Sequence, residues 1–221
     1  MVSRKVYARP VVDLSRAIEV VLEHAGDPRR AARVAALKAQ FEERTGAYTP
    51  DDAWFEVRSS AFWDDALTRG RFGDEVASLL DEGVRFWLKP LAAAHRGLFR
   101  VAGGATREGH RLDDVWSGAS FRVAPSRASG LADALRRAEG FVDGRVVAAV
   151  QSGTLVVELL GGAVFHPADA TPSIESLVPI ARERRLSRDA LLDSLLRMEL
   201  AFRNHSRVKA SFAYRKEALK P

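Results

Sequence analysis

The chain has 221 residues, enough for one domain or two small ones, and its 47% hydrophobic and 29% charged residues are typical of a globular rather than a disordered protein. It contains no cysteine, which excludes disulfides, thiolate metal sites and thiol nucleophiles. The formal net charge of +5 favours an anionic partner, although 28 arginines against six lysines also fit the codon bias of a GC-rich, bacterial-like genome.

Helical patterns begin the chain. Residues 13–25 carry apolar side chains at helical spacing, and Gly26 ends that pattern. Asp27 and Pro28 then predict the start of a second helix that runs to about Arg44, because aspartate caps helices and proline fits their first turn.

A similar start signal occurs at Thr49-Pro50, and we expect a short helix over about 61–68. A longer helix is predicted after Gly73, and Pro90 should kink or end it. This part of the chain is rich in large aromatic residues. Trp54, Trp63 and Trp87 would contact a protein partner if they remain exposed.

The pattern changes to alternating apolar and polar residues at Gly97. A turn at Gly103-Gly104 and another at Ser117-Gly118 predict a meander of three antiparallel strands. A short helix over 129–138 follows. Two further strands are predicted over 141–150 and 154–160.

These elements predict an α+β protein in three segments. Residues 1–96 form an N-terminal helical segment, residues 97–166 a β segment, and residues 167–221 a C-terminal helical segment. The β segment has the order β-β-β-α-β-β, which favours a small five-stranded antiparallel β-barrel, OB-like or SH3-like. A curled sheet packed on helices gives the same pattern. No low-complexity linker separates the segments, so we expect them to pack as one body.

The C-terminal segment should contain a helix over 173–184 and a second helix that Ser187 caps. A break is expected at 204–206, followed by a last helix. Positive charge is concentrated at the chain ends: residues 201–221 carry a net +5 and residues 1–9 carry +3, which leaves the body mildly acidic.

Nucleic acid is the predicted anionic partner. Single-strand-binding barrels stack bases on aromatic rings and line the groove with cations. The simpler interpretation is that the rings fill the core and the cations are solvated. The candidate nucleic-acid contacts in the strands and the C-terminal run are Arg100, Arg111, Trp116, Arg122, Arg203, Arg207, Lys209, Arg215 and Lys216.

Other chemistry has weaker support. The adjacent carboxylates Asp51-Asp52, Asp64-Asp65 and Asp113-Asp114 suit acid–base chemistry, but helix capping and solvated faces also explain them. The five histidines have no metal-ligand spacing, and no phosphate-binding glycine loop is present, so we expect no metal and no cofactor. His166 and Asp169, after the last strand, are the alternative pocket residues.

Our sequence-based hypothesis is a non-enzymatic binding or regulatory protein that contacts nucleic acid through its β segment and basic C-terminal end. The first alternative is a protein-interaction adaptor or assembly subunit that uses the aromatic helices, and the second is an enzyme with a site near His166. We expect a cytoplasmic protein, because the basic N-terminus lacks a signal-peptide pattern and no apolar run approaches the ~20 residues that a membrane span requires.

Overall fold

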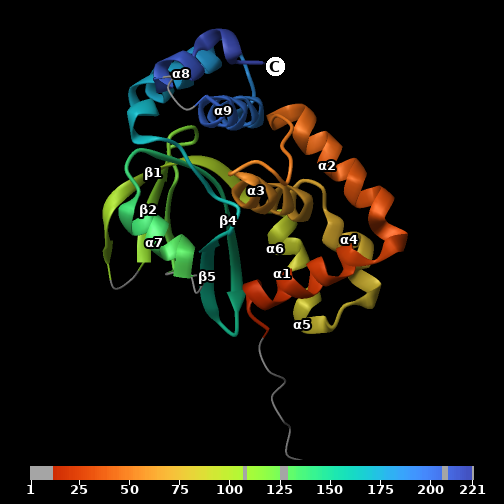
Figure 1. Ribbon diagram of the computed structural model, residues 1–221. Helices are drawn as coiled ribbons and strands as arrows, with labels where there is room; N and C mark the ends of the chain where they lie inside the picture. Colours follow the sequence, from red (N-terminus) through yellow and green to blue (C-terminus); the bar gives the residue numbers. More distant parts are fainter. Residues whose placement is uncertain (1–11, 107–108, 125–128, 206–208, 221) are drawn as a thin grey trace, which may run out of the picture.

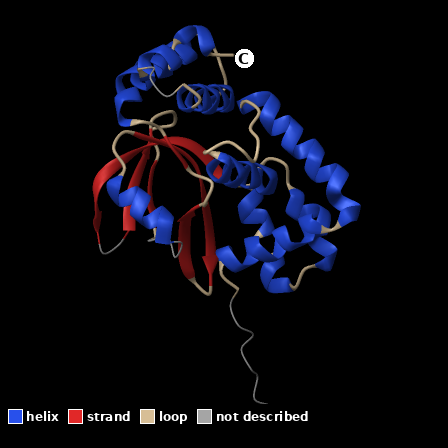
Figure 2. Cartoon of the chain, viewed as in Figure 1, coloured by secondary structure: helices blue, strands red, loops and turns tan. Residues whose placement is uncertain are grey.

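The computed structural model describes residues 12–106, 109–124, 129–205 and 209–220. It shows a curled antiparallel sheet flanked by the N-terminal helices on one side, while the C-terminal helices lie over one end of the strands (Figure 1). Figure 2 shows the same view coloured by secondary structure, with the strands grouped in one sheet and helices around it. The α+β class and the placement of helices before and after the sheet are therefore confirmed.

Aspartate side chains cap the start of each of the first two helical regions, as predicted for Asp27. Helix α1 (Leu14–Glu23) is capped by Asp13, which accepts a hydrogen bond from the Arg16 amide at 2.9 Å. Asp27 accepts from the Arg29 amide in the 3-10 turn η2 (Pro28–Arg30), and α2 (Ala31–Thr45) follows directly.

The next elements differ from the prediction. Helix α3 (Phe55–Thr68) starts six residues before the predicted short helix. The single long helix predicted after Gly73 is wrong, because Leu80 and Asp81 adopt extended backbone and interrupt it. Pro90 lies inside α6 rather than at a helix end. The pieces are α4 (Phe72–Val76), η3 (Ala77–Leu79), α5 (Glu82–Arg85) and α6 (Leu88–Ala92).

The N-terminal helices share an aromatic-rich core. Phe41, Phe62, Phe72 and Trp87 are almost completely buried in it. Val147 from the sheet belongs to the same core, so the N-terminal helices pack directly on the sheet. Burial of this much apolar surface is the main favourable contribution to folding.

The strands appear in the predicted order, with α7 (Ser129–Arg137) between the third and fourth. Five strands run in the spatial order β3-β2-β1-β4-β5, all antiparallel, and the short β6 pairs with β4. Their bounds are β1 (His95–Thr106), β2 (Gly109–Asp114), β3 (Ser120–Val123), β4 (Phe141–Gln151), β5 (Thr154–Leu159) and β6 (Val164–Phe165).

Two details of the β segment are corrected. The predicted turn at Gly103-Gly104 is wrong, because β1 continues through both glycines to Thr106 with an irregular register after Ala102. The sheet curls into a half-barrel and is not a closed barrel. Its edge strands β3 and β5 approach each other, and the Ala124 amide donates to the Val157 carbonyl at 2.9 Å.

The sheet has an inner face toward α7 and an outer face opposite it. Phe99, Leu112 and Val142 on the inner face pack with Leu131 and Leu135 of α7. The outer face of β1 and β4 is shared, since its Val147 contacts the N-terminal core whereas its Leu98 and Phe141 contact the C-terminal helices.

The C-terminal segment contains α8 (Thr171–Glu183), α9 (Arg188–Arg203), α10 (Ala210–Ala213) and the turns η4 (Ala168–Ala170) and η5 (Lys216–Ala218). Ser187 caps α9 as predicted, because its side chain accepts from the Ala190 amide at 3.1 Å. Helix α9 ends at Arg203, just before the predicted break. Within the described ranges, no helix has the length and apolar character needed to cross a membrane.

Candidate functional site

Buried charges gather where the N-terminal helices, the sheet and α9 meet. We call this the junction cluster. It alternates in sign along a chain of ion pairs whose members are Arg145, Asp65, Arg44, Asp193, Arg96 and Asp143. Arg44 and Asp65 come from α2 and α3, Asp193 comes from α9, and the other three lie on the sheet, so the ion pairs join all three segments.

Asp65 and Asp193 each bridge two or more arginines. One oxygen of Asp65 accepts from Arg145 at 2.6 Å and the other accepts from Arg44 at 2.6 Å. Asp193 accepts from Arg96 at 2.6 Å and from Arg44 at 3.2 Å. Such charge-assisted bonds are shorter and stronger than neutral ones, which offsets part of the cost of burial.

The strand register creates the cluster. Arg96 of β1 lies directly opposite Arg145 of β4, and both side chains are buried. Like charges in opposite positions destabilise a sheet unless counter-charges reach them. Asp143 on β4 supplies one counter-charge and accepts a hydrogen bond from Arg96 of β1 at 3.1 Å. The helices must supply the others, which ties the sheet to α3 and α9.

Burial and neighbouring charges raise the pKa of some groups in the cluster and lower the pKa of others. Burial opposes the charged form of Arg96, but Asp143 and Asp193 outweigh it and raise the pKa of Arg96. Burial and the nearby Arg96 lower the pKa of Arg145. Burial raises the pKa of Asp143 more than its arginines lower it. Perturbed pKa values of this kind are concentrated at functional sites, although ion-pair networks also show them.

Asp64 sits beside the cluster without a direct ion pair in the described part of the chain. Its carboxylate accepts the Gly162 amide at 2.8 Å. Burial raises the pKa of Asp64 to about 7, against the opposing effect of Arg145. The adjacent acids Asp64 and Asp65 therefore have different partners: a backbone amide for Asp64 and two arginines for Asp65.

A polar cavity of about 190 Å³ opens next to the junction cluster. Its described lining contains four arginines and two aspartates. The lining residues are Asp65, Thr68, Arg69, Ala92, Ala94, Arg96, Arg145, Arg188 and Asp189. We call it the junction pocket. Guanidinium groups hold oxyanions in forked geometry, so the pocket has the side chains that a small anion requires.

Two buried atoms in the lining, on side chains that are 32% and 45% exposed, lack a hydrogen-bond partner among the described residues. Arg188 Nε and Asp189 Oδ1 are buried, and neither hydrogen-bonds to any residue that the structure describes. They lie 3.5 Å apart as an ion pair without hydrogen-bond geometry. Arg69 is half exposed and makes only a long 3.4 Å contact to Asp193. Buried groups normally find partners, so a ligand that supplies both an acceptor and a donor fits here.

The predicted strand cations share the outer face of the sheet. Arg111 lies directly opposite Arg122, and Arg100 lies on the same face; all three are exposed. Arg100 pairs with Glu175 of α8 at 2.5 Å, and Arg111 pairs with Asp113 at 2.9 Å. The three arginines therefore lie on one face, and none of them is among the described lining of the junction pocket.

Trp116 lies in the turn after β2, where its side chain is half-buried. It packs with the core of the C-terminal helices. The Arg182 guanidinium lies 5.2 Å from the centre of its ring, and Arg182 also donates to the Trp116 carbonyl. One side of the ring is thus occupied by a protein cation.

The predicted C-terminal cations divide into separate environments. Arg203 pairs with Glu199 and lies 4.0 Å from the ring centre of Trp54. Lys209, Arg215 and Lys216 are exposed around α10 and η5. Arg207 lies outside the described residues. Contact of this group with nucleic acid stays a prediction.

The two residues of the alternative site differ in exposure: His166 is buried and Asp169 is exposed. His166 is buried and its Nδ1 lies 2.9 Å from the Tyr214 hydroxyl. Burial, helped by Arg203, lowers the pKa of His166 to about 3. Asp169 is exposed on η4, and it is not among the described lining of the shallow cavity that His166 borders.

The three tryptophans of the adaptor hypothesis differ in exposure. Trp87 is completely buried and its indole donates to the Val12 carbonyl at 2.9 Å. Trp54 and Trp63 are half-buried. Trp63 packs on the N-terminal core, whereas Arg203 covers Trp54.

Sequence analysis missed the arginines of the junction pocket. Arg145 lies in a predicted strand, where it has the pattern of a solvated cation, and Arg96 lies at the end of the predicted N-terminal helical segment, one residue before the predicted strands. The available signal was Asp64-Asp65 within the otherwise apolar run 61–67, which predicts buried counter-charges. Among the residues that the structure describes, no group of three or more histidine and acidic side chains is placed to hold a metal.

Comparison with models of known protein families, with curated proteins and with solved structures found no match.

Proposed function

We propose that this protein binds a small phosphate-type anion in the junction pocket and acts as a binding or regulatory protein. The observation that carries the proposal is a pair of buried atoms, Arg188 Nε and Asp189 Oδ1, that have no hydrogen-bond partner among the described residues and lie in a pocket whose described lining has four arginines. A protonated phosphate or a phosphorylated alcohol has oxyanions for the arginines and a hydroxyl for Asp189.

The chemistry of the lining favours binding over catalysis. The described lining residues include no histidine. The Thr68 hydroxyl, the only hydroxyl among them, donates to the Asp64 carbonyl at 2.6 Å and has no adjacent base to activate it. A bound anion would contact α3, β1, β4 and α9 at once, so its binding energy would stabilise the contact between the three segments.

Calorimetry and thermal unfolding with inorganic phosphate test the proposal, with sulfate at matched ionic strength as the comparison. Sulfate carries no proton near neutral pH and leaves Asp189 without a donor. We expect phosphate to bind the full chain and raise its Tm more than sulfate does. Arg188→Gln and Arg69→Gln should each weaken phosphate binding about ten-fold, the loss of one charged hydrogen bond.

Arg185→Gln is the matched control. Arg185 is exposed in the turn between α8 and α9, three residues before Arg188, and is absent from the described pocket lining. Equal stabilisation by sulfate and phosphate, or an equal effect of all three substitutions, would show general ion screening and contradict a specific site.

The outer face of β2 and β3 supports a second candidate function, the binding of single-stranded nucleic acid. Arg111 lies directly opposite Arg122 there, and both residues are exposed. Three strands, a helix and two strands in a partly open sheet are the element order of OB barrels, which bind oligonucleotides on this strand pair. Binding of an oligonucleotide should weaken steeply with salt and fall in the Arg111→Gln/Arg122→Gln double variant, but not in Arg136→Gln on α7.

A further inference from the structure

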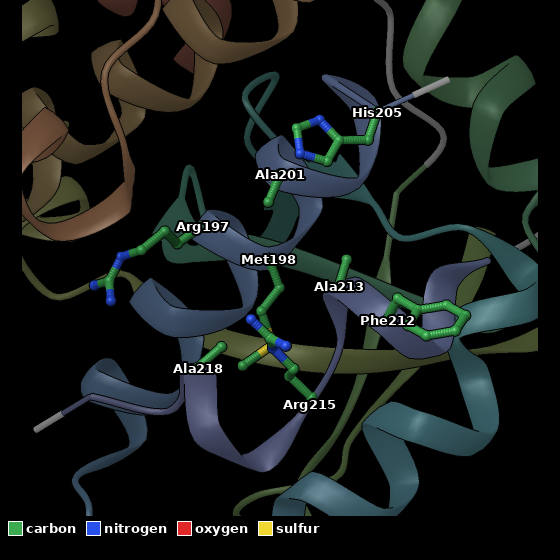
Figure 3. Close-up of a pocket in the computed structure, with 8 residues that line it drawn as sticks. All are labelled: Arg197, Met198, Ala201, His205, Phe212, Ala213, Arg215 and Ala218. Atoms are coloured by element: carbon green, nitrogen blue, oxygen red, sulfur yellow. The ribbon is translucent and has the colours of Figure 1, made fainter. Parts of the chain in front are cut away.

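A second cavity lies within the C-terminal helices, distinct from the junction pocket. It has a volume of about 320 Å³ between the C-terminal half of α9 and the segment from α10 to η5 (Figure 3). The described lining residues are Arg197, Met198, Ala201, His205, Phe212, Ala213, Arg215 and Ala218. We call it the α9 pocket. Its size is at the lower end of the range for small-molecule sites, ~300–1,000 Å³.

Most of the lining is apolar. Met198 is buried and provides the floor, and the three alanines leave the space that larger side chains would fill. Phe212 stands at the edge with two thirds of its surface exposed, 66%. Methionine is an adaptable side chain that suits apolar ligands of varied shape. An apolar group would therefore bind in the interior of this cavity.

The charged residues of the α9 pocket have one sign. Arg197 and Arg215 are present, and no acidic residue is among the described lining. The Arg215 side chain makes no hydrogen bond or ion pair within the described ranges. Arg197 donates one bond to the Arg44 carbonyl at 2.5 Å, and its buried Nη1 has no partner among the described residues. In Figure 3 the Arg197 guanidinium extends away from Arg215, so Arg215 is the cation that an anionic group in this cavity would meet.

From this combination we infer that the α9 pocket binds a small apolar monocarboxylate. The carboxylate pairs with Arg215, and the hydrocarbon lies on Met198 and the alanines. A volume of 320 Å³ holds about ten non-hydrogen atoms at the ~30 Å³ that each water occupies in the liquid, so a nine-carbon chain fills it while the attached carboxylate lies at the exposed Arg215. A phosphate-type ligand suits the α9 pocket poorly, because most of the lining cannot hydrogen-bond. The inference is independent of the function proposed for the junction pocket.

Titration calorimetry of the full chain with sodium decanoate, below its micellar concentration, tests this inference. Decanol is the uncharged comparison of equal chain length. We expect one decanoate site and weaker binding of decanol. Arg215→Gln should weaken decanoate binding at least ten-fold and leave decanol binding unchanged. Arg215 is exposed, so the variant should fold normally.

Two further variants distinguish binding inside the α9 pocket from a general effect of nearby positive charge. Ala201→Phe adds a ring at an exposed helix position that lines the cavity, and it should block both ligands. Lys209→Gln removes a nearby exposed cation outside the described lining and should change neither affinity. The inference is overturned if decanoate does not bind, if decanol binds as tightly as decanoate, or if Lys209→Gln weakens decanoate binding as much as Arg215→Gln.

Discussion

At the scale of single residues, the environment separates side chains of the same type. Asp65 accepts two short bonds from arginines, whereas the neighbouring Asp64 accepts one backbone amide in a buried position. Adjacent residues on a helix point about 100° apart, so they enter different surroundings. The consequence for Asp64 is a carboxyl group whose charge the folded state disfavours.

The pH dependence of stability should show the titration of Asp64. Its pKa is about 7 in the folded state and near 3.8 in the unfolded chain, so the folded state binds the proton more tightly. The contribution of Asp64 to the free energy of unfolding is fully present below pH ~4. It is lost as pH rises to ~7, and the loss is about 4 kcal/mol at most. Asp64→Asn should remove this loss, because an amide does not ionise and its oxygen still accepts the Gly162 amide.

Urea unfolding of both proteins between pH ~4 and ~8 measures the effect. The difference in unfolding free energy, variant minus wild type, should grow in favour of the variant as pH rises. A difference that is constant with pH would mean that Asp64 is ionised at all these values, and the assignment of its pKa would be wrong.

At the scale of elements, a tight backbone contact positions helix α3 against the segment that follows β5. The chain leaves β5 through two glycines, and only the second approaches α3 closely. A Cβ at Gly162 would lie 2.3 Å from the Ser60 carbonyl oxygen and 2.7 Å from the Asp64 carboxylate. A Cβ at Gly161 would meet nothing within 4 Å. Helix α3 can therefore contact the sheet segment only where position 162 has no side chain.

Gly162→Ala should destabilise the protein by roughly 1–3 kcal/mol, the usual cost of overpacking against fixed backbone. Gly161→Ala is a matched control on the adjacent residue and should stay within about 0.5 kcal/mol of wild type. Urea denaturation of the two variants provides the comparison. Similar midpoints for both would show that α3 can move away from Gly162 at little cost.

At the scale of the whole molecule, ion pairs connect segments that are distant in the sequence. Arg44 and Asp193 are 149 residues apart, and Arg96 and Asp193 are 97 residues apart. A buried ion pair does not necessarily stabilise relative to apolar residues, but removal of one partner leaves the other charge without compensation. The junction cluster therefore favours one arrangement of the three segments over others.

Asp65→Asn should destabilise the protein by about 3–5 kcal/mol, because Arg145 then remains buried without its carboxylate. Asp74→Asn, which breaks an exposed pair with Arg71, should have a much smaller effect. Unfolding followed by tryptophan fluorescence and by far-UV circular dichroism should also stay coincident in wild type. Equal effects of the two substitutions would mean that the junction cluster does not hold the segments together.

The sequence alone predicted the order of most elements, most of the strands and the caps at Asp27 and Ser187. Those features depend on side-chain periodicity and on hydrogen bonds between residues a few positions apart, which the sequence displays directly. It failed at residues 73–92, where the helical spacing of apolar residues continues although the backbone breaks at Leu80.

Only the tertiary structure decided which charges are buried and which cavities form. In the sequence Arg96 and Arg145 resemble ordinary solvated cations, but the register places them opposite each other and α3 and α9 bring Asp65 and Asp193 to them. The strength of an ion pair depends on distance and burial, and both are set by residues far away in the chain. The junction pocket and the α9 pocket are products of that packing, and no local pattern encodes them.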